Sequence, residues 1–193
     1  AVREAIGPDI ALMVDVAYAW QDYKEALTVA RQLEPYNLFF LEAPLPSDDL
    51  DGYARLADTT DIRIAAGELL NSRFEFRDLI ERGHIDVAQP DVGRVGGLTE
   101  ARRVVEYAAD RGRLIVPHCW KTGIGIAASA NLCAAAPNAP FFEYLPAPLA
   151  ESSLRRELVT EDITLVNGHL SLPDLPGLGV TLNEEALASY RVL

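Results

Sequence analysis

Cysteine and basic residues are scarce in this chain of 193 residues. It has two cysteines, Cys119 and Cys133, and 17 lysines and arginines against 29 acidic residues, for a net charge of −12. Two cysteines are too few for a disulfide framework and lack the spacing of a zinc finger, so reduced thiols are expected. The acidic balance argues against nucleic acid and anionic membranes as partners. A bound metal could still invert the local charge and admit a small anionic substrate.

Long apolar runs are also missing. No stretch reaches the roughly 18 apolar residues of a membrane helix, and the opening AVREAIGPD lacks the basic-then-apolar plan of a signal peptide. No membrane partner and a cytoplasmic location are therefore expected. Hydrophobic residues nevertheless make up 49% of the chain, enough to bury a sizeable core in one large domain or in one domain plus a tail.

Short apolar runs alternate with amphipathic segments along most of the chain. Strands are predicted at 10–14, 37–41, 62–66, 85–88, 114–116 and 140–142, and helices at 21–34, 48–58, 72–83, 99–112 and 123–135. The helices show apolar residues at i, i+3 and i+4 spacing, and Thr99 is the expected N-cap of the fourth. Repeated βα units with continuously apolar strands indicate an α/β fold with a parallel sheet covered by helices.

Each predicted strand is followed by an acid or a histidine. The residues are Asp15, Glu42, Glu68, Asp91, His118 and Glu143, with successive gaps of 27, 26, 23, 27 and 25 residues. This period matches one βα unit, so the side chains should gather at the carboxyl ends of the strands, where TIM barrels build their active sites. An open sheet would leave some of these carboxylates buried without partners. A TIM-type (β/α) barrel is therefore favoured.

The barrel should be partial. Six βα units are visible where a closed barrel needs eight, so about two units are expected to precede the chain. Residues 1–145 are predicted to form the C-terminal part of the barrel. Residues 146–193 should form an extension beside it, with a type I′ hairpin at Asn167-Gly168 and a short helix in NEEALASY.

The rim residues suggest a metal site and a base. Asp15, Glu42 and Glu68 follow three adjacent predicted strands, and hard carboxylate oxygens with open positions suit Mg²⁺. A single acid of this kind is more often a solvated strand end, but three in phase favour a site. An Asp beside a His fixes its tautomer and raises its basicity, so Asp91 and His118 together suit a general base.

Several motifs carry a resemblance to a known family. They are MVDVAYAW, FLEAPL, AAGE, QPDVGRVGGLTEAR, PHCWKTGI, FFEYLP and LPDLPGLGV. In order and spacing they resemble the C-terminal barrel portion of the enolase superfamily, mandelate racemase subgroup, over essentially the whole chain. The resemblance implies Mg²⁺ at Asp15, Glu42 and Glu68, an Asp91–His118 dyad as base, and Glu143 hydrogen-bonding the substrate carboxylate or its enediolate.

The chain departs from that family in one visible place. Family members often carry Asn two residues after the first metal ligand, whereas this chain has Ala17, which puts a contact to the site or to substrate in question. The family's other catalytic group, commonly a Lys on an earlier strand, would precede Ala1.

The expected reaction is proton removal α to a carboxylate, with a metal neutralising the developing enediolate. We expect dehydration of a sugar acid to a 2-keto-3-deoxy acid, with Trp120 and Lys121 binding the substrate, in a homo-oligomer. Racemisation or epimerisation and cycloisomerisation are alternatives within the same superfamily. A metal-dependent aldose isomerase or hydrolase barrel is an alternative of another class, although it usually needs more histidines than the single rim His118. The last alternative is that the chain is a non-catalytic fragment.

Overall fold

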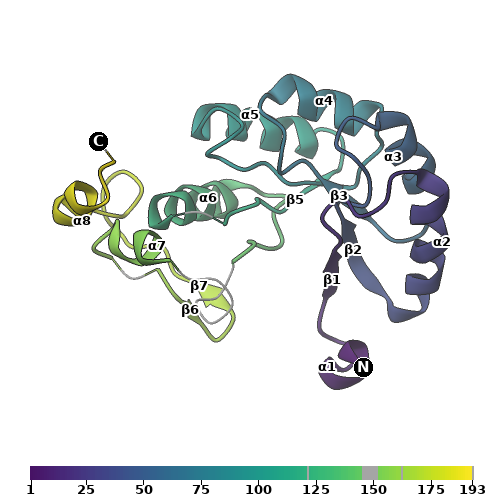
Figure 1. Cartoon of the computed structure of the whole chain (residues 1–193), viewed down its shortest axis with the longest axis horizontal. Helices are drawn as coiled ribbons and strands as arrows, with labels where there is room; N and C mark the ends of the chain where they lie inside the picture. The colour runs from purple at the N-terminus through teal and green to yellow at the C-terminus, as the bar shows by residue number, and fades with distance from the viewer. Residues whose placement is uncertain (121, 145–151, 162, 193) are drawn as a thin grey trace.

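Five parallel strands form the centre of the fold in the order of the sequence. The computed structural model describes residues 1–120, 122–144, 152–161 and 163–192. The strands pair side by side as β1 (Leu12–Asp15), β2 (Leu38–Glu42), β3 (Ile64–Ala66), β4 (Val87–Ala88) and β5 (Leu114–Ile115). The pairing places Asp15 opposite Glu42, and Glu42 opposite Ala65. The predicted parallel α/β arrangement is thus confirmed for these five units (Figure 1).

The helices that connect the strands lie on one side of the sheet (Figure 1). They are α2 (Tyr23–Leu33), which runs into a short 3₁₀ turn (Glu34–Tyr36), α3 (Leu50–Ala57), α4 (Arg73–Glu81) and α5 (Leu98–Ala109). After β5 comes α6 (Gly123–Ala135), and α1 (Val2–Ile6) precedes β1. In a doubly wound sheet, helices would cover both faces, so sequential strands with helices on one face indicate a barrel wall. None of the helices described is long and apolar enough to cross a membrane.

Local side chains explain most of the helix starts. Asp22, Asp49, Ser72 and Thr122 each accept a backbone N–H of the first turn of a helix, as preferred N-caps do. The prediction that Thr99 caps α5 is wrong. The helix begins at Leu98 with Gly97 as its N-cap, because Gly96 and Gly97 adopt positive φ angles of 104° and 86° and turn the chain two residues earlier.

The two faces of the sheet are buried differently. Leu41, Ile64, Ala66 and Ile115 point toward the helices and join a large core with residues such as Phe76 of α4. The opposite, inner face carries a separate and smaller cluster of Phe40, Ala65, Val87 and Val116. Strand side chains alternate between faces, so the outer core anchors the strands and the inner face remains for the site.

The C-terminal segment forms a second layer against α6. It contains α7 (Ser153–Glu157), the hairpin β6 (Leu165–Val166) and β7 (His169–Leu170), and α8 (Glu184–Ser189). Asn167 and Gly168 have φ angles of 51° and 76°, and β6 and β7 pair antiparallel around them, so the predicted type I′ hairpin is present. Asn131 of α6 donates to the Leu178 carbonyl at 3.1 Å. The predicted start of this extension, Pro146, lies outside the described residues.

The predicted strand at 140–142 is wrong, since residues 140–142 are in no strand. Pro140 has no N–H to give to a sheet ladder. From β5, the Ile115 N–H donates to the Asn138 carbonyl at 3.0 Å, two residues before Pro140.

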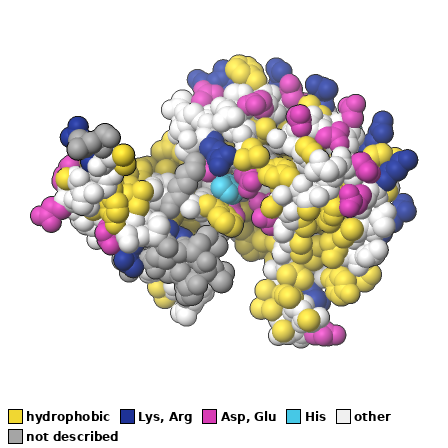
Figure 2. All heavy atoms as spheres, viewed as in Figure 1, with side chains coloured by type: hydrophobic (Ala, Val, Ile, Leu, Met, Phe, Trp, Pro, Cys, Tyr) yellow, Lys and Arg dark blue, Asp and Glu magenta, His cyan; other side chains and the backbone are white. Residues whose placement is uncertain are grey.

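Charged and hydrophobic side chains gather in different places on the surface. Figure 2 shows charged side chains over the helices α2 to α5 and a gathering of hydrophobic side chains toward β1 and α1. In this part of the chain, Val2 of α1 and Ile10, which precedes β1, are each more than half exposed.

Gly67 is a position where the fold demands glycine. Its φ is +126°, and a Cβ built there would lie 2.4 Å from Cε1 of Phe76 in the outer core. Both the backbone conformation and the close approach of α4 exclude a side chain. The residue that follows is Glu68, so this glycine fixes where that carboxylate begins.

We expect Gly67→Ala to lower the free energy of unfolding by about 2–4 kcal/mol, from backbone strain plus the clash with Phe76. Gly112→Ala is the matched control, because Gly112 has a φ of +67° but nothing within 4 Å of its added Cβ. Thermal melting of the full-length protein measures both. Equal drops in melting temperature would show that the clash with Phe76 contributes nothing.

Candidate active site

The period of two along each strand brings the rim side chains onto the inner face. Asp15 follows Met13 by two residues, Glu42 follows Phe40, and His118 follows Val116, and all three preceding residues belong to or pack on the inner cluster. Residues i and i+2 share a face of a strand. The predicted strand-end residues therefore follow the inner-facing positions at the carboxyl ends of β1, β2 and β5.

Glu68 reaches this rim by a different route. It comes two residues after the end of β3, three after the inner-facing Ala65, so strict alternation would point it toward the helices. The positive φ of Gly67 turns the chain, and the Glu68 carboxylate lies 3.3 Å from Nε2 of His118. A glycine next to the carboxylate is therefore part of the site.

Asp91 and His118 form the predicted pair. Nδ1 of His118 donates to Oδ2 of Asp91 at 2.9 Å, and Oδ1 of Asp91 accepts the Gly93 N–H at 2.8 Å. Both residues are buried. With both of its oxygens held, Asp91 fixes the imidazole tautomer and turns Nε2 toward the carboxylates.

The environment strengthens the basicity of His118. Burial lowers its pKa, but the Asp91 hydrogen bond and the charges of Glu143, Glu68 and Asp91 outweigh burial, so the pKa is raised. An imidazole of this kind takes up a proton more readily than a free one, which suits a general base.

Glu42 is a buried carboxylate among other carboxylates. Burial raises its pKa to about 8, and the charges of Glu143, Asp15 and Glu68 add to the rise. The fully buried Gln89 amide lies close enough to oppose it, although the Gln89 side chain atoms and Oε1 of Glu42 lack a hydrogen-bond partner with good geometry. The acidic groups around Glu42 are thus only partly compensated by the Gln89 amide.

These carboxylates fit a divalent cation such as Mg²⁺. Oε1 of Glu42 is a buried oxygen without a partner, three acidic groups act on it, and all donors are the hard oxygens that Mg²⁺ prefers. As they stand, no three acidic, imidazole or thiol groups among the described residues converge into a metal-binding cluster. Asp15 is exposed and accepts the Ala17 N–H at 2.8 Å, and Glu68 faces His118.

Glu143 is held by the two residues that follow His118. Its oxygens accept the Cys119 N–H at 3.1 Å and the Trp120 indole N–H at 2.5 Å. Burial raises the pKa of Glu143, and the Trp120 hydrogen bond, the His118 charge and the Cys119 hydrogen bond oppose the rise. The Trp120 ring is half exposed and parallel to the His118 ring, with centroids 6.1 Å apart.

Sequence reasoning identified most of this rim and missed two members. Gln89 lies two residues before Asp91 on the same inner-facing pattern, so the period of two in VAQPD could have found it. Tyr18, whose hydroxyl is buried near Glu68, gave no signal, because its placement depends on a turn with positive φ. Lys121, predicted to bind substrate, lies outside the described residues.

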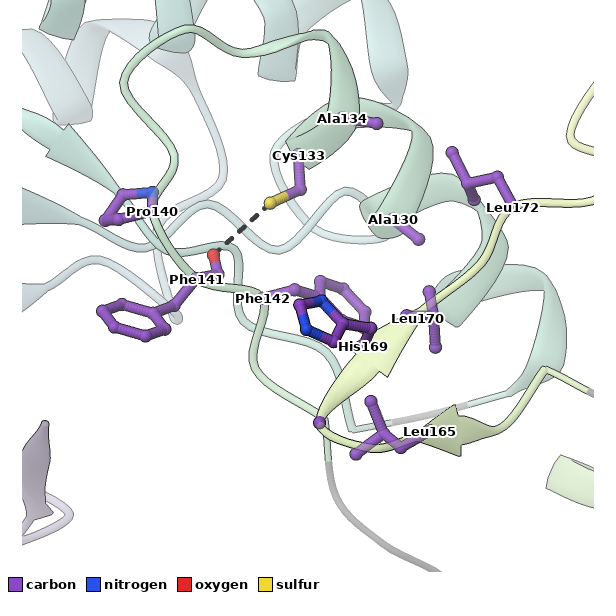
Figure 3. Close-up of a pocket in the computed structure, with 11 residues that line it drawn as sticks. Ala130, Cys133, Ala134, Pro140, Phe141, Phe142, Leu165, His169, Leu170 and Leu172 are labelled. Carbon is purple, nitrogen blue, oxygen red and sulfur yellow. Dashed lines mark hydrogen bonds between the residues drawn. The ribbon is translucent and has the colours of Figure 1, made fainter. Parts of the chain in front are cut away.

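A pocket lies apart from the rim. It measures about 570 Å³ and lies between α6 and the β6–β7 hairpin (Figure 3). Its walls are mainly apolar, and the Cys133 thiol donates to the Phe141 carbonyl at 3.4 Å. It shares no residue with the dyad or the carboxylates, so the rim remains the candidate site.

Comparison with known proteins agrees with this assignment of the fold. The family model "Enolase C-terminal domain-like" matches residues 1–186. D-galactarolactone cycloisomerase of Agrobacterium fabrum is 34% identical over 197 residues, covering 100% of this chain and 52% of that enzyme. Arabinonate dehydratase of Saccharolobus solfataricus is 34% identical, covering 99% and 50%. The chain thus spans about half the length of the curated relatives it matches.

A solved structure with bound ligands shows the same architecture. L-talarate dehydratase from a Polaromonas species, complexed with Mg and L-glucarate, superposes with a TM-score of 0.84 and 34% sequence identity, covering 97% of this chain and 49% of that one. The predicted TIM-type barrel, present here in part, and the resemblance to the enolase superfamily are therefore confirmed.

The raised pKa of Glu42 predicts a pH-dependent stability. The folded chain binds the Glu42 proton more tightly than the unfolded chain, so stability present below the ordinary pKa of 4.5 is lost as pH rises through about 8. In chelator at pH 8, the free energy of unfolding of Glu42→Gln should therefore exceed that of the unmodified protein by on the order of 3 kcal/mol. At pH 4 the variant should be no more stable than the unmodified protein, and thermal melting at both pH values measures the difference. A difference that does not change between these pH values would contradict the assignment.

Proposed function

The chain belongs to the enolase C-terminal domain-like family, and we propose that the full-length protein uses this rim to remove a proton α to a carboxylate. The observation that carries the proposal is the orientation of His118. Its Nδ1 is fixed by Asp91 at 2.9 Å and its Nε2 faces the carboxylates, 3.3 Å from Glu68. A base held in this way is aimed at whatever the carboxylates bind.

We propose Mg²⁺ as the cofactor, held by Asp15, Glu42 and Glu68. When bound, it would neutralise the negative charge that develops on the substrate carboxylate as the α-proton leaves. Nε2 of His118 accepts that proton, and Asp91 stabilises the imidazolium that results. Glu143, held by Trp120 and Cys119, faces the same space and, when protonated, would donate a hydrogen bond to the substrate carboxylate or enediolate.

The proposed substrate is a sugar acid. Relatives of this chain include arabinonate dehydratase and L-talarate/galactarate dehydratase, and a similar structure holds Mg and L-glucarate. After His118 removes the α-proton, the carbon–oxygen bond at the β-position breaks. The hydroxyl takes up the proton from the His118 imidazolium and leaves as water, which returns His118 to its neutral form. The enol that remains tautomerises to a 2-keto-3-deoxy acid.

We propose that Trp120 contributes to substrate binding through its ring rather than through its N–H. The N–H already donates to Glu143, whereas half of the side chain surface is exposed. An exposed indole face beside His118 can stack on the apolar face of a sugar. We also propose that Lys121, which lies outside the described residues, contacts the substrate.

Cycloisomerisation is the second candidate. D-galactarolactone cycloisomerase matches this chain over its whole length, and the same α-proton removal can begin either reaction. The two differ in what the enediolate does next, which depends on the substrate rather than on the dyad.

We expect Mg²⁺-dependent keto-acid formation from at least one member of a sugar-acid panel, assayed with the full-length protein. His118→Asn removes the base and should lower the rate by about 10²–10⁴-fold, the contribution typical of a positioned general base. His84→Asn is the matched control, since His84 is exposed and pairs with Asp58 at 2.9 Å on another surface, and it should keep full activity.

The same panel in D₂O separates the alternatives. Exchange of the α-proton without loss of water would favour a racemase, epimerase or cycloisomerase. Absence of both exchange and dehydration across the panel, with Mg²⁺ present, would contradict proton removal from these acids.

A further inference from the structure

The loop after β1 has an unusual backbone. Ala17 and Tyr18 are consecutive non-glycine residues with φ angles of 45° and 62°. L-residues avoid this left-handed region, and for a bulky residue such as Tyr it is an outlier. Conformations of this kind persist where the surroundings impose them, and they cluster at functional sites. The conformation raises the question of what Tyr18 is placed to do.

Hydrogen bonds tie this loop to the carboxylate rim. The Tyr18 N–H donates to the Ala43 carbonyl at 2.7 Å and the Val16 N–H donates to the Glu42 carbonyl at 3.2 Å. The Ala17 N–H donates to Oδ1 of Asp15 at 2.8 Å. The backbone of Tyr18 is therefore fixed relative to Asp15 and Glu42, the two strand-end carboxylates that face each other across β1 and β2.

The phenol of Tyr18 extends from this loop toward Glu68. Its hydroxyl is buried and has no hydrogen-bond partner with good geometry, yet Glu68 lies close enough to act on it. A tyrosine hydroxyl is protonated at neutral pH, so the phenol is available as a donor. A buried donor beside a carboxylate that it does not quite reach is one short side-chain movement from a hydrogen bond.

Glu68 also has a contact with His118. One of its oxygens lies 3.3 Å from Nε2 of His118, the nitrogen that the proposed reaction needs free. Its side chain is 19% exposed, so it is not locked by packing. A hydrogen bond from the Tyr18 hydroxyl would compete with this contact for the Glu68 carboxylate.

We propose that Tyr18 is a positioning residue for Glu68. Its hydroxyl donates to one Glu68 oxygen, which leaves the other oxygen for the cation and leaves Nε2 of His118 for the substrate. This inference rests on the proposed metal site. It also gives a role to the left-handed turn at Ala17 and Tyr18, because strained backbone of this kind persists where the surroundings impose it and clusters at functional sites.

The test is Mg²⁺ binding to the full-length protein without substrate, measured by titration calorimetry. Tyr18→Phe keeps the ring and removes the hydroxyl, so we expect Mg²⁺ affinity to fall roughly tenfold or more while the melting temperature in chelator stays unchanged. Tyr53→Phe is the matched control. The Tyr53 hydroxyl is also buried near these acids, but it donates to the Leu45 carbonyl at 2.8 Å. Its loss should lower the melting temperature and leave Mg²⁺ affinity as it was.

The outcomes separate this inference from the proposed function. If the unmodified protein binds Mg²⁺ and Tyr18→Phe binds it equally well, the positioning role is overturned and the metal site stands. If the unmodified protein binds no Mg²⁺, the metal site fails and the inference fails with it. If Tyr18→Phe lowers the melting temperature as much as Tyr53→Phe and leaves affinity unchanged, the phenol is structural.

Discussion

Negative charge buried among other negative charges is the constraint from which the rest of this site follows. Glu42 lies at a strand end with little exposed surface, and the charges of Glu143, Asp15 and Glu68 act on it. Such an arrangement costs free energy unless the charges are compensated by protons, donors or a cation. A fold that kept it for structure alone would do better with apolar residues. The proposed function gives the cluster a purpose, because the same charges that burden the fold attract a divalent metal.

The fold can accommodate the cost of these buried carboxylates because most of its apolar core lies on the other face of the sheet. The outer face of the strands and the helices α2 to α5 share one large core, whereas the inner face holds only a small cluster beneath the rim. Polar groups such as Gln89 and His118 stand above that small cluster, where they displace few apolar contacts. This separation of faces lets a (β/α) barrel carry varied chemistry at the carboxyl ends of its strands.

Backbone geometry then selects which groups meet. Parallel register alone places Asp15 beside Glu42. The Glu68 carboxylate reaches the His118 imidazole because Gly67 turns the chain, and Tyr18, whose phenol lies near Glu68, has a left-handed backbone. In both cases neighbouring elements enforce the turn: Phe76 of α4 packs against Gly67, and the Ala43 carbonyl accepts the Tyr18 N–H. The residues with positive φ angles are thus the ones next to, or part of, the groups that meet at the rim.

The sequence by itself determined the order of strands and helices, the rim positions of Asp15, Glu42, Asp91 and His118, and the hairpin at Asn167-Gly168. These follow from local apolar periods, which repeat with each βα unit, and from turn chemistry. Only the tertiary structure decided the start of α5 at Leu98, the absence of a strand at 140–142, the approach of Glu68 to His118 and the places of Gln89 and Tyr18. Each depends on positive φ angles or on neighbours across strands, and no local pattern of residue types encodes which distant groups come into contact.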